Sequence, residues 1–262
     1  MNLGLSGKIA LVTASSKGIG KEIATSLGKE GAKVIISSSN SLNLETTRKE
    51  LASSGIDVYA IVCDLSKPEE VNKLSDEIIG KFGGVDIFVF NTGGPKPGDL
   101  FDLNEEDWYK GFELVLMSAV RLTKAFLPKM IEKGWGRIVY MTSMSVKEPI
   151  DGLLLSNVFR SGLNAFSKSL SRVIRKDNIT FNVICTGNII TERAIKLIEN
   201  RSIKLNKSFD DVKKEIEMSI PLGRYGTTEE IADFVTFLCS ERSSYINGTS
   251  IQVDGGFIRG IL

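Results

Sequence analysis

The sequence contains no histidine among its 262 residues, which removes the usual general base and the commonest metal ligand. Hydrolysis by a Ser-His-Asp triad is excluded for the same reason. Only three cysteines occur, Cys63, Cys185 and Cys239, and none belongs to a CxxC pair. We therefore expect reduced core thiols and no metal site. Any acid–base chemistry must use Tyr, Lys, Asp, Glu or Cys.

An excess of one charge sign and long apolar runs are also missing. The chain has 33 basic and 32 acidic residues, so it offers no strong field for nucleic acid and no polybasic patch for a membrane. No apolar run reaches the roughly 18 residues of a spanning helix, and the N-terminal MNLGLSGKIALVT has no cleavable signal pattern. We expect a cytoplasmic protein with a small-molecule ligand and neither a nucleic-acid nor a membrane partner.

Short β-branched runs alternate with longer stretches of helical period. Strands are predicted at 8–13, 32–37, 57–64, 85–91, 136–143, 179–186 and 249–254. Helices are predicted at 18–30, 43–53, 68–81, 105–132, 153–176 and 228–239. This alternation implies right-handed crossovers and an α/β fold with a doubly wound parallel sheet in three α/β/α layers. We expect one domain over residues 1–262.

Capping residues predict the starts of two helices, and one further segment departs from the regular alternation. Ser66 is expected to cap the helix that begins KPEEV, and Thr227 or Thr228 the helix that begins at EE. The Lys- and Glu-rich segment 191–220 interrupts the alternation and has helical period. It follows a strand end, where ligands bind in such sheets, so it is either a substrate lid or a solvated helical pair.

A glycine turn follows the first strand and opens the first helix. Residues Thr13 to Gly20 read TASSKGIG. Glycines there let the backbone approach a pyrophosphate, and the helix N-terminus supplies unpaired N–H groups and a favourable dipole. The loop resembles TGxxxGIG, the cofactor loop of the short-chain dehydrogenase/reductase family, with Ala14 at the first glycine. A small residue of ordinary φ is expected to fit there.

Further segments extend this resemblance over residues 5–257. Asp64 follows the third strand, Asn91 opens NTGG where the family has NNAG, and Ser143 ends the fifth strand. PLGRYGTTEEIADFVTFLCS and TSIQVDGGF resemble the C-terminal third of the family. The similarity is to the ketoacyl-reductase-like branch and implies a Rossmann fold, a nicotinamide cofactor and a homo-oligomer, a dimer or a homotetramer. The apolar tail GGFIRGIL fits either a subunit contact or a buried terminal strand.

The resemblance also implies which residues hold the dinucleotide. Asp64 is expected beside the adenine, Asn91 beside its ribose, and Ile189 and Thr191 at the nicotinamide end. The whole expected set is Ala14, Ser15, Ser16, Lys17, Gly18, Ile19, Gly20, Ser38, Ser39, Asn40, Asp64, Leu65, Asn91, Thr92, Gly93, Arg160, Ile189 and Thr191. For Asp64 and Asn91 the alternative is a strand-end cap.

Charge indicates which dinucleotide is preferred. An NAD site places a carboxylate about 20 residues after the glycine turn, to bind the ribose 2′-hydroxyl and repel a phosphate. Here Ser38, Ser39 and Asn40 occupy that region, and the next acid is Glu45. Lys17, inside the loop, is placed to reach a 2′-phosphate. The sequence predicts NADP(H), with NAD(H) the weaker candidate.

The segment that resembles the family's catalytic helix lacks the usual catalytic residues. The family uses a tyrosine, a lysine four residues later, a serine and an asparagine; here Ser156, Arg160, Ser143 and Val115 align with them. None of the five tyrosines is followed four residues later by lysine. A serine hydroxyl is a far weaker acid than a phenol, and arginine has an ordinary pKa above 12. The predicted catalytic residues are Ser143, Ser156 and Arg160, the last as a ribose ligand and oxyanion stabiliser.

The helix that carries Ser156 and Arg160 keeps a core-facing periodicity. Val158, Leu163, Phe166 and Leu170 are expected to face the core. Other charged residues, Lys96, Lys147, Glu148 and Asp151, are candidate replacement acids, although solvated loop charges are the simpler interpretation.

Three functions remain open. The first is an NADP(H)-dependent oxidoreductase with a substituted proton donor, acting on a small alcohol, carbonyl or sugar-like substrate. The second is a catalytically silent NADP(H)-binding protein with a sensor or assembly role, because three of four catalytic positions are replaced. The third is elimination or dehalogenation, which ranks last because relatives of that kind keep the tyrosine and lose the cofactor loop.

Overall fold

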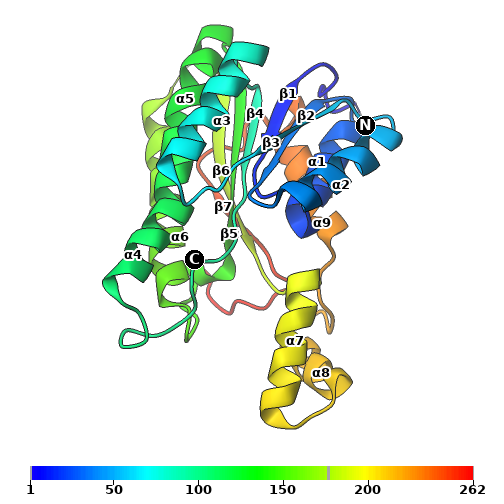
Figure 1. Ribbon diagram of the computed structural model, residues 1–262, viewed down its shortest axis with the longest axis vertical. Helices are drawn as coiled ribbons and strands as arrows, with labels where there is room; N and C mark the ends of the chain where they lie inside the picture. The colour runs from blue at the N-terminus through cyan, green and yellow to red at the C-terminus, as the bar shows by residue number, and fades with distance from the viewer. Residues whose placement is uncertain (1, 176–177, 262) are drawn as a thin grey trace.

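The computed structural model describes residues 2–175 and 178–261, and its centre is a seven-stranded parallel sheet. The strand order is β3-β2-β1-β4-β5-β6-β7 (Figure 1). The strands are β1 (Ile9–Val12), β2 (Lys33–Ser38), β3 (Val58–Val62), β4 (Ile87–Phe90), β5 (Gly136–Ser143), β6 (Ile179–Thr186) and β7 (Ser250–Val253). The predicted doubly wound α/β sheet is confirmed.

Helices cover both faces of the sheet. They are α1 (Gly18–Lys29), α2 (Ser41–Ser53), α3 (Pro68–Phe82), α4 (Glu105–Phe112), α5 (Ser118–Lys133), α6 (Leu154–Val173), α7 (Glu192–Leu205), α8 (Phe209–Ser219) and α9 (Thr228–Leu238). Helices α1, α2 and α9 pack on one face, and α3, α5 and α6 on the other. The expected three layers are present, because the strands are buried under helices on both faces.

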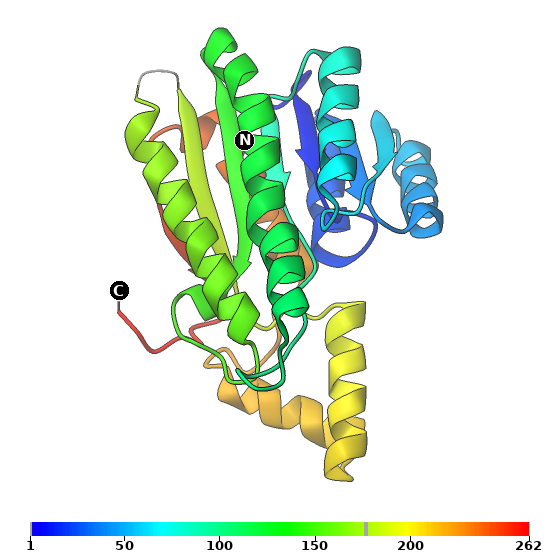
Figure 2. The ribbon, with the colours of Figure 1, turned by 60° about the vertical axis from the view of Figure 1, so that its left-hand side comes forward.

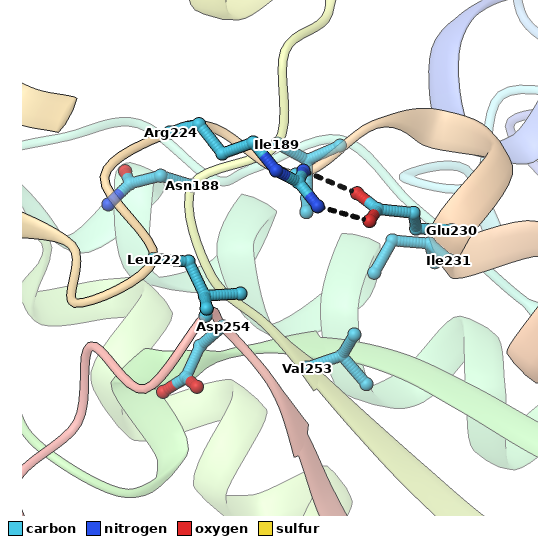
Figure 3. Close-up of a pocket in the computed structure, with 10 residues that line it drawn as sticks. Asn188, Ile189, Leu222, Arg224, Glu230, Ile231, Val253 and Asp254 are labelled. Carbon is cyan, nitrogen blue, oxygen red and sulfur yellow. Dashed lines mark hydrogen bonds and ion pairs between the residues drawn. The ribbon is translucent and has the colours of Figure 1, made fainter.

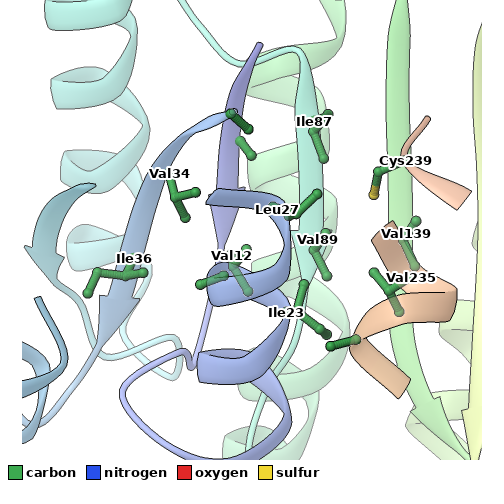
Figure 4. Close-up of a cluster of buried hydrophobic side chains, with 14 of the residues drawn as sticks. Val12, Ile23, Leu27, Val34, Ile36, Ile87, Val89, Val139, Val235 and Cys239 are labelled. Atoms are coloured by element: carbon green, nitrogen blue, oxygen red, sulfur yellow. The ribbon is translucent and has the colours of Figure 1, made fainter. Parts of the chain in front are cut away.

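Alternate residues of each strand enter two separate cores. Val12 packs with Ile23 and Val235 on one face (Figure 4), whereas Leu11 joins Phe88 and Phe126 on the other. Successive side chains of a strand point to opposite faces, so each buried strand needs apolar residues at nearly every position. This explains why the strands read as continuous apolar runs.

Three helix boundaries differ from the predictions. The helix expected at 105–132 is divided by a π-helical turn, Glu113–Met117, between α4 and α5. Helix α2 begins at Ser41, because the Asn40 side chain accepts a hydrogen bond from the Asn43 N–H. Helix α6 ends at Val173, before the expected end at residue 176, which itself lies outside the described residues.

The two predicted caps have opposite outcomes. Ser66 does not cap α3: Lys67 occupies the cap position, Pro68 follows at the first helical turn, and the Ser66 hydroxyl donates to Asp64 Oδ1 at 2.7 Å. The Ser66 hydroxyl, which the sequence pattern predicted at the helix N-terminus, is hydrogen-bonded to the Asp64 carboxylate instead. Thr227 does cap α9 and forms a reciprocal capping box with Glu230.

Residues 191–220 fold into two helices, as their helical period predicts, and a lid role for them stays a prediction. Helices α7 and α8 extend away from the carboxyl ends of the strands (Figure 2) and pack together around Ile198 and Val212. Where this pair returns to α9, Arg224 forms a double ion pair with Glu230, 2.6 and 2.9 Å between nitrogen and oxygen (Figure 3). The base of the pair is therefore held by ionic contacts.

The segment after β7 is not a terminal strand. Beyond Val253 the described chain turns at Gly255 and Gly256 and then runs without regular structure to Ile261, whose side chain is exposed. The alternative of a buried C-terminal strand in this tail is wrong for its described part, although β7 itself lies at the edge of the sheet. The three cysteines are buried and free, as expected.

Candidate functional site

Three adjoining cavities lie where the strand order reverses, at the carboxyl ends of the strands. The loop cavity, about 460 Å³, lies along the glycine loop and the start of α1. The strand-end cavity, about 170 Å³, lies beyond β2 and β3. The central cavity, about 320 Å³, lies beyond β5 and β6. Thr92 lines all three, so they form one continuous site at the switch point of the sheet.

Cross-links between the first and fourth strands shape the glycine loop. The Thr13 hydroxyl donates to the Asn91 carbonyl at 2.6 Å, and Asn91 Nδ2 donates to the Ala14 carbonyl at 3.2 Å. A Cβ on Gly20 would collide with that same Ala14 carbonyl. Glycine is therefore required at position 20 by close packing of the loop against its own helix.

Ala14 does not have the ordinary φ expected for it. Its φ is 46°, in the left-handed region, where a Cβ is unfavourable. The loop thus keeps the backbone shape that glycine would adopt at this position and carries the strain of an alanine. The sequence reasoning was wrong here because the Asn91 contact and the helix start together fix the turn.

The loop cavity contains Lys17, which lies in an ion pair. Lys17 Nζ is 2.8 Å from Glu192 Oε2 at the start of α7, and about half of each side chain or more is exposed. Lys17 holds the pKa of the Glu192 carboxyl below its ordinary value. The contact ties the glycine loop to the helical pair across the mouth of the site.

The strand-end cavity joins residues from the ends of β2 and β3. Ser38, Ser39, Asp64 and Leu65 line it, and a 2.9 Å hydrogen bond from Ser16 to Ser38 holds the glycine loop beside it. Asp64 Oδ1 accepts two hydrogen bonds from Ser66, through its N–H and its hydroxyl. Asp64 is therefore both a strand-end cap and a cavity residue, so the two interpretations of it are compatible.

Most of the residues expected to hold a dinucleotide line these three cavities. They are Ala14, Lys17, Gly18, Ile19, Ser38, Ser39, Asp64, Leu65, Asn91, Thr92, Gly93, Arg160, Ile189 and Thr191. Four others do not. Ser15 is fully buried and donates to the Val12 carbonyl, Ser16 bonds to Ser38, Gly20 packs against Ala14, and Asn40 caps α2.

The site has the features that a dinucleotide needs. The N-terminus of α1 opens onto the loop cavity, a Cβ on Gly93 would meet no atom within 4 Å, and Gly93 lines two of the cavities. The buried Thr92 hydroxyl has no hydrogen-bond partner in the described part of the chain. Open backbone, helix N–H groups and an unsatisfied hydroxyl fit a phosphate- and ribose-bearing ligand.

The three predicted catalytic residues lie together on the wall of the central cavity. Ser143 ends β5, and Ser156 and Arg160 come from the first two turns of α6. Arg160 Nε donates to Ser156 Oγ at 3.2 Å, and Arg160 Nη1 donates to the Met141 carbonyl at 3.1 Å. Two turns of one helix and one strand end therefore position a guanidinium and two hydroxyls around the same space.

Burial changes the acidity of this guanidinium. Only 8% of Arg160 is exposed, and its surroundings lower its pKa to about 10. Burial is the largest cause, followed by the positive charge of Arg193, while the Cys185 thiol acts in the opposite direction. Arg160 remains a cation at neutral pH, so it can stabilise negative charge that develops in the cavity.

No tyrosine takes the place of the missing phenol. All five tyrosines are described, and none of them lines the central cavity. Tyr140, three residues before Ser143, is fully buried and hydrogen-bonds to Thr123 at 2.8 Å, and burial raises its pKa. Val115 lies fully buried inside the π-helical turn, so that turn offers no side-chain hydrogen bond at this position.

The helix α6 presents most of its expected apolar face to the core. Leu163 is fully buried, and Phe166 and Leu170 pack on the same core cluster. Val158 is 44% exposed, so its assignment to the core was wrong. The first two turns of α6 place Ser156 and Arg160 at the cavity, and the Val158 side chain lies on the opposite, outer side of the helix.

Two residues were not predicted from the sequence: one lines the central cavity and the other contacts its serines. Arg193, in the first turn of α7, lines the cavity, and its guanidinium lies against Gly94. Ser145 is buried, lies 3.5 Å from Ser156 Oγ, and donates its backbone N–H to Ser143 Oγ at 3.3 Å. Its position two residues after Thr191, an expected cofactor residue, was the signal that could have found Arg193. The Lys- and Glu-rich segment around it suggested a solvent-exposed helix instead.

The charged residues considered as replacement acids do not lie free at the central cavity. Lys96 pairs with Asp107, so it is not a free charge at the site. Lys147, Glu148 and Asp151 do not line the central cavity.

The described residues contain no group of three or more His, Cys, Asp or Glu side chains able to hold a metal ion, and none of their helices is long and apolar enough to cross a membrane.

Comparison with known proteins agrees with this architecture. Residues 13–258 match a family model described as enoyl-(acyl carrier protein) reductase. The chain is 33% identical to the uncharacterized oxidoreductase YvrD of Bacillus subtilis, with full coverage of both proteins. It is also 33% identical to the 3-oxoacyl-acyl-carrier-protein reductase FabG of Aquifex aeolicus, over 98% of this chain and 99% of that protein.

A solved structure is similar over the same length. L-sorbose reductase from Gluconobacter frateurii, complexed with NADPH and L-sorbose, superposes with a TM-score of 0.96 at 33% identity and covers all of both chains. The family match, the full-length relatives and the switch-point site agree. The chain belongs to the short-chain dehydrogenase/reductase family.

Proposed function

We propose that this chain is an NADP(H)-dependent oxidoreductase that interconverts a small alcohol and its carbonyl compound, with a substituted proton donor. The observation that carries the proposal is the composition of the central cavity. Ser143, Ser156 and Arg160 line it together with Ile19, Asn91, Thr92, Ile189 and Thr191, residues expected at the cofactor. A carbonyl in this space therefore meets both the polar residues and the expected nicotinamide end.

The chain's own residues supply electrostatic stabilisation. A bound nicotinamide supplies or accepts the hydride. Ser143 donates a hydrogen bond to the reacting oxygen, and the Arg160 guanidinium stabilises the alkoxide that forms there. Ser156 accepts the Arg160 Nε–H and so keeps its own hydroxyl proton for the substrate oxygen. Because a hydroxyl is a weak acid, the final proton comes from water through the open mouth of the cavity.

Several observations support NADP(H) as the cofactor. Ser38 and Ser39 line the strand-end cavity where an NAD site would place a carboxylate. Lys17 lies at the adjoining loop cavity, where its present partner is the exposed Glu192 carboxylate. The sorbose reductase neighbour is described as complexed with NADPH, and so is a polyketide ketoreductase neighbour with 31% identity and a TM-score of 0.90.

The decisive test combines cofactor binding with turnover. Fluorescence titration of the whole protein is expected to give tighter binding of NADPH than of NADH. A panel of small ketones, aldehydes and alcohols is then followed by nicotinamide absorbance at high protein concentration. We expect slow turnover, because the loss of a positioned acid reduces rates by about 10² to 10⁴.

The variants separate the two candidate functions. Ser143→Ala is expected to remove turnover while leaving NADPH binding unchanged, and Ser169→Ala, on the exposed part of α6, serves as the control. Tight NADPH binding with no turnover on any member of the panel would support the silent nucleotide-binding protein instead. No binding of either dinucleotide would refute both.

A further inference from the structure

The ionisable side chains that line the central cavity all carry a positive charge. Arg160 and Arg193 are the only ionisable side chains among the residues that line it. The other lining residues are glycine, proline, apolar residues, serine, threonine and asparagine. A site of about 320 Å³ with two cations and no acid favours an anionic ligand.

Arg160 is a buried cation that pairs with no acidic side chain of residues 2–175 and 178–261. Its two hydrogen bonds go to neutral acceptors, the Ser156 hydroxyl and the Met141 carbonyl. In the described part of the chain it forms no ion pair, and its Nη2 group makes no hydrogen bond to protein. Burying an unpaired charge is costly, so the fold holds a site that an anion would stabilise.

Arg193 brings a second guanidinium to the same cavity from a different element. It stands in the first turn of α7, and a Cβ added to Gly94 would lie 2.8 Å from its Nη2 atom. Its neighbour Glu192 is occupied by Lys17 rather than by Arg193. The two arginines repel each other, and an anion bound to both would turn this repulsion into attraction.

The chemistry of guanidinium groups narrows the ligand. Each presents parallel N–H donors that match the oxygens of a carboxylate or a phosphate, and such charged hydrogen bonds are stronger than neutral ones. A neutral polyol would leave both cations uncompensated. L-sorbose, named with the sorbose reductase neighbour, is a neutral sugar, so this pocket favours a different kind of substrate.

We propose that the substrate of this chain carries an anionic oxygen group, a carboxylate or a phosphate ester, which binds between Arg160 and Arg193. The proposal rests on the proposed function for the place of the cofactor. The anion itself is recognised by the two arginines, so its binding is measurable without turnover.

Matched pairs of carbonyl compounds test the charge requirement. Pyruvate is compared with methyl pyruvate, and dihydroxyacetone phosphate with dihydroxyacetone, by calorimetric titration of the whole protein with and without saturating NADPH. In at least one pair we expect the charged member to bind about tenfold or more tightly. The pair that shows the preference identifies the anionic group as a carboxylate or a phosphate ester.

Variants connect that preference to the two arginines. Arg193→Gln and Arg160→Gln are each expected to reduce the ratio of affinities about tenfold, and Arg160→Lys to retain part of it because the charge is kept. Lys204→Gln, an exposed residue on the same α7 and outside the cavity lining, is the matched control and should leave the ratio unchanged. Thermal unfolding of each variant verifies that it is folded.

Three results would overturn the proposal. The first is equal affinity for the charged and uncharged members of each pair. The second is an unchanged ratio of these affinities in folded Arg193→Gln and Arg160→Gln. The third is an Arg193→Gln variant that loses affinity for NADPH alone. The last result would assign Arg193 to the cofactor. A protein that binds the anions but turns over no carbonyl compound would refute the oxidoreductase proposal and leave anion recognition intact.

Discussion

Arg160 donates its Nε–H to the hydroxyl of Ser156, one helical turn before it, at a distance of 3.2 Å. The alignment predicts these two residues at the positions of the family's lysine and tyrosine, and the structure places them in direct contact. The guanidinium fills one lone pair of the Ser156 oxygen and leaves its proton for another acceptor. A cation and a hydroxyl therefore remain together, without a phenol.

Restoring the phenol and the lysine tests whether proton donation limits the reaction. The double variant Ser156→Tyr with Arg160→Lys is expected to raise carbonyl reduction by about 10² or more, the usual contribution of a positioned acid. The rate of nicotinamide oxidation with an uncharged ketone is the measurement. Ser156→Phe with Arg160→Lys is the control, since it adds the ring without the hydroxyl. Equal rates in the two double variants would show that the acid is not limiting.

Replacing Ala14 by glycine is expected to stabilise the protein. The left-handed φ of 46° strains an alanine by about 1–2 kcal/mol, while glycine loses about 0.5–1 kcal/mol more entropy on folding. The net gain in the free energy of unfolding is therefore between about 0 and 1.5 kcal/mol, measured by urea unfolding. Ala52→Gly, at an exposed position in α2, is the control and should destabilise by about 1 kcal/mol. A loss of stability in Ala14→Gly would contradict the strain argument.

Glu230→Gln is expected to lower the thermal unfolding midpoint in a pH-dependent way. Arg224 first, and then the Thr227 N–H, lower the pKa of the Glu230 carboxyl from 4.5 to about 2. Because the folded pKa is depressed, the stabilisation is present above the ordinary pKa and is lost as pH falls through about 2. The difference from the parent protein should therefore shrink as the solution is acidified over that range.

The matched control for this pH dependence is Asp233→Asn, an exposed acid on the same helix α9. Its thermal unfolding midpoint should differ only slightly from that of the parent protein at every pH. A constant difference for Glu230→Gln across the acid range would mean that its carboxylate charge is not the source of the stabilisation.

Glu192→Gln is expected to strengthen NADPH binding by about threefold, because it releases Lys17 from an exposed ion pair of modest strength. NADH affinity should stay unchanged, since the released charge acts on the 2′-phosphate alone. Both affinities are measured by fluorescence titration, with Glu199→Gln on the same helix as the control. An equal gain for both dinucleotides would place Lys17 away from the 2′-phosphate.

Periodicity and turn residues predicted most of the fold because they act locally. The seven strands, the parallel order and the helical pair at 191–220 follow from patterns within single segments. The errors arose where a distant group intervened. Asp64 took the hydroxyl of Ser66 away from α3, and the π-helical turn at Glu113–Met117 divides a segment of uninterrupted helical period.

The sequence by itself determined the absence of histidine, the missing tyrosine–lysine pair and the alternation that produces a doubly wound sheet, since each is a property of composition or local order. Only the tertiary structure decided that Arg160 is buried with no carboxylate partner among the described residues and that Arg193 shares its cavity. Segments more than 30 residues apart come together there, and the charge of a cavity depends on which side chains meet in space.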